Sequence, residues 1–245
     1  MSNSNIYIRK LELDMNNRIG CLILHGFAGN LEEIEPLNKY LSSKGFITLC
    51  PIMKGHMGRR RDLAFVKYSE WIKSAETSLL DLKSKCEKIF VLGFSMGGLI
   101  AMNLVQVHKI DGIITLNTPI YHWDMKRISK NVVNDIKIKN YKNIKYYFRS
   151  AVGIPFSALI NFKLLLLKTK PLLKNIICPI FITQGLLDDT ARWKSADYIY
   201  KNIPSDIKDI KYYNNTDHII CHSTDNNELF NDIEKFIVKV LHINN

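Results

Sequence analysis

The sequence predicts an α/β protein with a mostly parallel sheet of about seven strands, flanked by helices, and a helical lid inserted before the penultimate strand. Apolar runs of strand length alternate along the chain with stretches at helical spacing. The 245 residues are 47% hydrophobic and 23% charged, which excludes general disorder and fits one large domain with an insertion. A long basic segment interrupts the alternation. We therefore expect a core at 1–119 and 176–245 and a basic lid at 120–175.

Taken in order, the expected strands are apolar runs, and the expected helices are amphipathic stretches between them. The strands are Ile6–Leu13, Ile19–Leu24, Phe46–Cys50, Lys88–Leu92, Gly112–Leu116, Pro179–Thr183 and Ile207–Tyr212. The helices are Leu31–Ser43, Ser69–Lys85, Gly97–His108, Arg192–Ile203 and Asn226–Leu241. Gly45 follows the first helix, where a left-handed cap is expected. Asp225 and Glu228 predict a capping box at the last helix.

The positive charge of the chain belongs to the predicted lid. The formal net charge is +11, and the segment 120–175 alone holds twelve basic and two acidic residues, a balance of +10. Within it, Ile128–Tyr147 predicts a polar helix and Phe156–Leu167 an apolar one, with Phe156 and Leu164–Leu167 expected to pack inward. A solvated face over an apolar underside explains this pattern, and contact with an anionic membrane surface is the functional alternative.

The five cysteines predict a reducing compartment. They are odd in number, widely spaced and never in a CxxC pair, as expected of buried thiols rather than of disulfides or a zinc site. The first residues, MSNSNIYIRKLELD, lack the pattern of a secretory signal. We expect a cytoplasmic protein with neither metal nor organic cofactor. Nucleic acid is not expected as a partner, because no recognition motif accompanies the charge.

The strongest chemical signal is the segment from Gly93 to Gly98, GFSMGG, which lies between a predicted strand and a predicted helix. This is the G-x-S-x-G elbow in its required context. Gly93 and Gly97 lack side chains where the tight turn brings backbones together, and the turn exposes the hydroxyl of Ser95 at the helix N-terminus. Ser95 is therefore the predicted nucleophile. A glycine-rich turn without catalysis is the alternative.

A serine nucleophile needs a base, and the base needs an acid that orients it. Beyond the elbow and the lid, His218 lies in the loop before the last predicted helix, and we prefer it to His222 as the base. The loop after the predicted strand Pro179–Thr183 supplies Asp188 and Asp189. We favour Asp188 as the acid and keep Asp189 as the alternative.

The loop His25-Gly26-Phe27-Ala28-Gly29 follows an early predicted strand. Its backbone can offer an N–H group to the oxyanion of a tetrahedral intermediate, beside the N–H of the residue after the nucleophile. The predicted donors are the amides of Phe27 and Met96. We expect His25 to support the loop by hydrogen bonds, together with Gly26, rather than to act as a base.

The motifs HGFAG, GFSMGG, GLLDD and TDHII, in this order, resemble the α/β-hydrolase superfamily, and within it small bacterial carboxylesterases and monoacylglycerol-lipase-like esterases. The likeness covers about residue 18 to the end and includes Pro51–His56, which is similar to the family's P-x-x-x-G-H pattern. It implies that Ser95, Asp188 and His218 form a triad with oxyanion donors at Phe27 and Met96. The basic lid is where the chain departs from the family.

The resulting expectation is a serine carboxylesterase that hydrolyses esters of short to medium acyl chains through an acyl-enzyme, with a small-molecule ester as its partner. A monoacylglycerol lipase or acyl transferase with the same triad is the first alternative. A hydrolase-fold protein that binds a ligand with little turnover is the second, and a damaged triad would be its mark.

Overall fold

The computed structural model describes residues 18–121, 125–141, 145 and 153–243. In these residues six strands form one parallel sheet in the order β2-β1-β3-β4-β5-β6. The strands are β1 (Ile19–Leu24), β2 (Ile47–Leu49), β3 (Lys88–Phe94), β4 (Gly112–Leu116), β5 (Ile180–Gly185) and β6 (Lys208–Tyr213). They match six of the seven predicted strands, and the seventh, Ile6–Leu13, lies outside the described residues.

The order of the strands places two of the predicted motifs side by side. The chain runs from β1 outward to β2 and then crosses back to β3 on the other side of β1, so the order reverses between β1 and β3. Leu24 pairs with Gly93 at the carboxyl ends of these two strands. Ligands bind in open parallel sheets outside the carboxyl ends of the strands at such a reversal. The HGFAG and GFSMGG loops both begin at this point.

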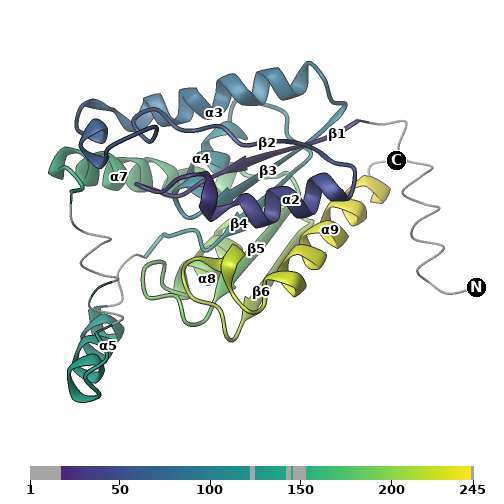
Figure 1. The fold of residues 1–245 in the computed structure, drawn as a ribbon. Helices are drawn as coiled ribbons and strands as arrows, with labels where there is room; N and C mark the ends of the chain where they lie inside the picture. Colours follow the sequence, from purple (N-terminus) through teal and green to yellow (C-terminus); the bar gives the residue numbers. More distant parts are fainter. Residues whose placement is uncertain (1–17, 122–124, 142–144, 146–152, 244–245) are drawn as a thin grey trace, which may run out of the picture.

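Helices cover both faces of the sheet, because alternate side chains of each buried strand point to opposite faces. Leu22 and Leu24 pack with α3 (Tyr68–Lys83) and α4 (Met96–Leu104), whereas Cys21 and Ile23 pack with α2 (Glu35–Ser43) and α9 (Asn226–Ile243). Figure 1 shows these two layers on either side of the sheet, and α8 (Lys194–Asn202) lies against β5 and β6. Almost every residue of α4 is buried, as its continuous apolar sequence requires.

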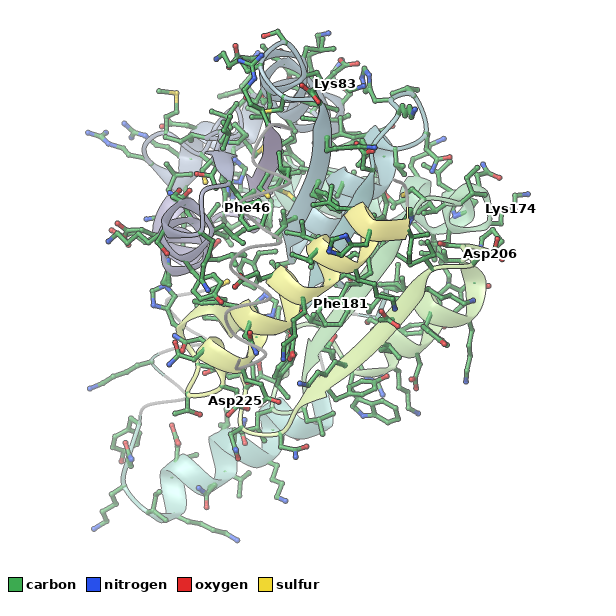
Figure 2. The ribbon with its side chains drawn as sticks, turned by 90° about the vertical axis from the view of Figure 1, so that its right-hand side faces the viewer. Phe46, Lys83, Lys174, Phe181, Asp206 and Asp225 are labelled. Atoms are coloured by element: carbon green, nitrogen blue, oxygen red, sulfur yellow. The ribbon has the colours of Figure 1, made fainter. Side chains whose placement is uncertain are left out.

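The last helix closes one face of the sheet. Figure 2 shows α9 in front of the strands, with Phe181 of β5 behind it, and the ring of Phe181 stacks on Phe236 of α9 with 5.5 Å between centroids. Asp225 precedes α9, and its Oδ2 atom accepts hydrogen bonds from the Asn215 amide and the Thr216 hydroxyl, both at 3.1 Å. Asp225 thus ties the start of α9 to the loop that leads to His218.

The connection from β4 to β5 contains α5 (Met125–Lys137), α7 (Phe156–Thr169) and the short helix η3 (Lys170–Asn175). In Figure 1 α5 projects from the body, while α7 lies against α3, α4 and η2 (Arg60–Phe65). No helix of the described residues combines the length and apolar character needed to cross a membrane.

Two expectations about this connection are wrong. The polar stretch Ile128–Tyr147 is not one helix, because α5 ends at Lys137 and Lys139 has a φ of 52°, outside the helical region. Part of that stretch lies outside the described residues. In α7, Leu165 and Leu166 are buried, but Phe156 is 77% exposed and Leu167 is 53% exposed. A helix with apolar residues on all sides can bury only the face that meets its neighbours, so the remainder points outward.

Candidate active site

Ser95 lies in a strained turn between β3 and α4. Its φ of 50° and ψ of −114° lie where residues with side chains are rarely found, a conformation that costs on the order of 1–3 kcal/mol. A Cβ atom on Gly93 would lie 2.3 Å from the backbone of Gly97, and one on Gly97 would lie 2.3 Å from the Leu24 carbonyl oxygen. These neighbouring backbone atoms cannot move aside as a flexible side chain could, so neither position can accept a side chain. The glycines therefore make the turn possible, and the surrounding structure holds Ser95 in it.

His218 and Asp188 form a hydrogen bond at the same edge of the sheet. The Nδ1 atom of His218 lies 2.8 Å from Oδ2 of Asp188. The ring of His218 also lies against Phe94, the neighbour of Ser95, with 5.1 Å between ring centroids. The structure shows no hydrogen bond between the side chains of Ser95 and His218. Such catalytic contacts are often long without substrate and tighten when it binds.

The structure distinguishes between the two candidate acids. Asp188 is 2% exposed, and its Oδ1 atom accepts the N–H groups of Thr190 and Ala191, each at 2.8 Å. Asp189 is half-buried and accepts a hydrogen bond from the Thr190 hydroxyl at 3.3 Å. These two backbone donors fix the direction of the Asp188 carboxylate. Asp188 is therefore the carboxylate that the structure brings to His218.

The protonation of His218 reflects these neighbours. Burial of the ring lowers its pKa, but the charge and hydrogen bond of Asp188 raise it, with additional contributions from Glu33 and Asp189, and the pKa of His218 lies above its usual 6.5. The protonated ring is therefore stabilised at this position. A histidine that accepts a proton during a reaction gains from such stabilisation.

Asn117, which the sequence analysis did not single out, joins the parts of the site. Its amide nitrogen donates to the carbonyl oxygens of Asp217 and His218 at 2.8 and 2.9 Å, and its Oδ1 atom accepts the N–H of Gly185 at 2.7 Å. The preceding residue, Leu116, accepts the N–H of Ser95 at 2.8 Å. Two consecutive residues at the end of β4 thus contact the elbow and the loops of Asp188 and His218. The sequence signal was only a polar residue at a strand's carboxyl end.

Two neutral histidines hold the loop of Phe27. The Nε2 atom of His25 accepts the N–H of Met53, and the Nε2 atom of His56 accepts the N–H of Ala28, both at 3.1 Å. Burial is the main cause that lowers the pKa of both rings, to about 4 for His25. Ala28 has a φ of 54°, which this hydrogen bond stabilises. The ring of His25 thus links the end of β1 to the backbone of Met53, which follows β2.

The predicted amide donors lie on the two loops at the β1–β3 reversal. Met96 is fully buried as the first residue of α4. The ring of Phe27 stacks on Phe162 of α7 with 5.0 Å between centroids and meets the ring of Trp71 edge to face at 5.7 Å. Trp71 therefore packs against the loop of Phe27. Glu33, which the sequence analysis also missed, accepts the N–H of Gly26 at 3.0 Å.

Comparisons with known proteins agree with this architecture. A sequence model of the alpha/beta hydrolase fold matches residues 22–135. A thermostable monoacylglycerol lipase of Bacillus sp. (strain H-257) is 28% identical over 83% of this chain and 84% of its own length. A carboxylesterase of Bacillus subtilis (strain 168) is 25% identical over 89% of this chain and 92% of its own.

Solved structures show the same fold. One, from work on the metagenome-derived lipolytic enzymes LipS and LipT, has a TM-score of 0.76 at 20% identity and covers 91% of this chain and 94% of its own. A soluble variant of monoglyceride lipase from Saccharomyces cerevisiae, in complex with a substrate analogue, has a TM-score of 0.72 at 20% identity, with 92% and 88% covered. The predicted fold class and the resemblance to α/β-hydrolases are confirmed.

Proposed function

We propose that this chain, which has the α/β-hydrolase fold, is a serine carboxylesterase in which Ser95, His218 and Asp188 act together. The observation that supports this most directly is the 2.8 Å hydrogen bond between His218 and the buried Asp188, beside the strained turn of Ser95. The relatives named for ester hydrolysis support the same class of reaction in general terms.

The mechanism follows from the roles of these groups. Nδ1 of His218 is bound to Asp188, so Nε2 is the ring nitrogen that takes the proton of Ser95 as its Oγ atom attacks the ester carbonyl. The N–H groups of Phe27 and Met96 bind the oxyanion, and His218 then protonates the departing alcohol. Water, activated by His218, hydrolyses the acyl-enzyme and restores Ser95. Asp188 keeps the ring in its tautomer and stabilises the cation.

A fluorophosphonate probe tests this proposal without knowledge of the substrate. The probe phosphonylates a serine that a neighbouring base activates. We expect one label per chain, and peptide mass spectrometry should locate it on Ser95. Asp188→Asn should slow the labelling strongly, because the base is then misoriented. Absence of labelling, or labelling at another serine, would contradict the proposal.

The substrate is proposed to be an ester of a short to medium acyl chain, and a monoacylglycerol is the second candidate because a relative bears that name. Rates on aryl esters of increasing chain length, compared with rates on monoglycerides, distinguish the two. A higher kcat/KM on long-chain monoglycerides would favour the second candidate. Transfer of the acyl group to an added alcohol would favour an acyl transferase. Stoichiometric binding without product would favour a ligand-binding protein.

We also propose that residues 120–175 form a lid on the core, with weak contact to an anionic lipid surface. The exposed apolar stripe of α7, which includes Phe156 and Leu167, lies beside the exposed lysines Lys163 and Lys168. Such a surface suits a membrane of anionic lipid, where each basic residue contributes about 1 kcal/mol. Nucleic acid is not proposed as a partner.

Sedimentation with vesicles of phosphatidylserine and phosphatidylcholine tests the lid. We expect salt-sensitive binding that the double variant Lys163→Glu, Lys168→Glu reduces. The matched control, Lys201→Glu, Lys235→Glu, changes exposed lysines of α8 and α9 and the same net charge. Equal binding of both double variants would contradict a specific role for α7.

A further inference from the structure

Glu33 lies against the Gly26–Gly29 loop, which contains Phe27. It belongs to the short helix η1 (Leu31–Glu33), and its Oε2 atom accepts the N–H of Gly26 at 3.0 Å. A Cβ atom on Gly29 would lie 2.2 Å from both carboxylate oxygens of Glu33. The carboxylate therefore fills the space that the glycines leave, and it contacts the loop at both ends.

Glu33 is also linked to the surroundings of His218 through the ring of Phe94. A Cβ atom on Gly26 would lie 3.0 Å from the ring of Phe94 as well as 3.0 Å from Glu33, so Phe94 and Glu33 face Gly26 together. The Phe94 ring also lies against His218, with 5.1 Å between ring centroids. The helix η1 is also tied to the residues after His218, because the His222 ring donates from Nε2 to the Glu32 carbonyl oxygen at 2.7 Å.

Burial and the surrounding groups act in opposite directions on the pKa of the half-buried Glu33 carboxylate. Burial is the largest effect and raises the pKa of Glu33 above its usual value, while the Gly26 N–H and the charges of His218, His222 and Arg60 oppose that rise. From the side of His218, the charge of Glu33 raises the pKa of the ring, after the larger contribution of Asp188 and together with Asp189. Charge on Glu33 and charge on His218 are therefore mutually stabilising.

We propose that Glu33 is a positioning residue for ester hydrolysis, which fixes the Gly26–Gly29 loop and supplies a second negative charge that stabilises the His218 imidazolium. This inference rests on the proposed function. Glu33 thus has two effects on one reaction. It holds the loop of the oxyanion donor in place, and its charge stabilises the cation that forms as Ser95 attacks, in a site of low dielectric.

The test is Glu33→Gln, which removes the charge and keeps an oxygen that can accept the Gly26 N–H. The first readout is the pKa of the His218 ring, measured by NMR titration. We expect it to fall by about half a unit or more, about threefold in the protonation equilibrium. The matched control is Glu32→Gln, which removes an equal charge from the exposed neighbour and should leave the titration unchanged.

The second readout is the pH profile of ester hydrolysis. In Glu33→Gln the acid limb of kcat/KM should move to lower pH, because neutral His218 persists there, while kcat on the plateau falls about 3- to 10-fold as the transition-state cation loses its partner. A residue that serves only structure would lower activity without moving the limb. Gly29→Ala provides a second variant, because it keeps the charge but pushes the carboxylate away, and the His218 pKa should fall there too.

These outcomes separate the inference from the function on which it rests. If the wild-type protein hydrolyses no ester, the proposed function fails together with the role of Glu33 in it. If the protein is active but the pKa of His218 and the pH limb are the same in Glu33→Gln and wild type, the inference is overturned and the triad stands. If Glu33→Gln does not fold, as thermal unfolding would show, the titration of Gly29→Ala decides.

Discussion

The Nδ1 atom of His218 lies 2.8 Å from Oδ2 of Asp188, although 30 residues separate them in the chain. The backbone amides of Thr190 and Ala191 donate to the other carboxylate oxygen, so the direction of the Asp188 side chain is fixed independently of the His218 ring. His218 must then bear a proton on Nδ1, which leaves Nε2 for the proton of Ser95.

Asp188→Asn tests this relationship. The amide can present its N–H₂ group to Nδ1 and so favour the wrong tautomer, and we expect kcat to fall by about 10³- to 10⁴-fold with KM little changed. Asp189→Asn is the matched control, since Asp189 accepts a hydrogen bond from the neighbouring Thr190 hydroxyl, and this change should lower kcat by less than about tenfold. A larger loss in Asp189→Asn than in Asp188→Asn would reverse the assignment.

The pH dependence of hydrolysis should report the raised pKa of His218. Catalysis needs the neutral ring, so kcat/KM should fall as the pH drops through a pKa above the usual 6.5. The measurement is kcat/KM on an aryl ester between pH 5 and pH 9. In Asp188→Asn the limb should move to lower pH, because the largest contribution that raises the pKa is gone. A wild-type limb below 6.5 would be inconsistent with the ion pair.

Asn117→Ala should remove the side-chain contacts that join the loops at the end of β4. The change removes the hydrogen bonds to Asp217, His218 and Gly185 and leaves buried groups without their partner. We expect the free energy of unfolding to fall by about 2–3 kcal/mol and kcat to fall more than KM rises, because the base is misplaced rather than the substrate site. Asn103→Ala, which loses bonds to Leu99 and Thr169 away from the elbow, should lower stability alone.

The stability of the protein should fall on acidification, partly because of His25. Burial, together with repulsion from His56 when that ring is protonated, lowers the pKa of His25 to about 4, whereas in the unfolded chain it is 6.5. The unfolded state therefore takes up the proton first, and stability present above pH 6.5 is lost as the pH falls towards 4. Between pH 7 and pH 5 His25 should account for about 2 kcal/mol.

Urea unfolding of wild type and His25→Gln at these two pH values measures that contribution. The variant should be less stable at pH 7, and its stability should change less between pH 7 and pH 5. His242→Gln, at an exposed position of α9, should keep the wild-type dependence. Equal pH dependence in His25→Gln and wild type would show that His25 is not held neutral.

The described strands and the position of the elbow could be predicted because local sequence determines them. Gly93 and Gly97 are required wherever a strand turns into a helix around Ser95, so the motif alone reveals the turn. The choice between Asp188 and Asp189 depends on which side chain the Thr190 and Ala191 amides bind, and that depends on the tertiary fold. The inward packing predicted for Phe156 is wrong because composition alone does not indicate which side of an apolar helix contacts its neighbours. Asn117 and Glu33 belong to no motif, and only the contacts across the fold reveal them.

The most direct test of the central claim is kcat/KM on a short-chain aryl ester for wild type and Ser95→Ala, with thermal unfolding to show that both are folded. The account predicts measurable hydrolysis by the wild type and a loss of about 10³-fold or more in Ser95→Ala, since Ser95 is the proposed nucleophile that forms the acyl-enzyme. Full activity in Ser95→Ala would contradict it.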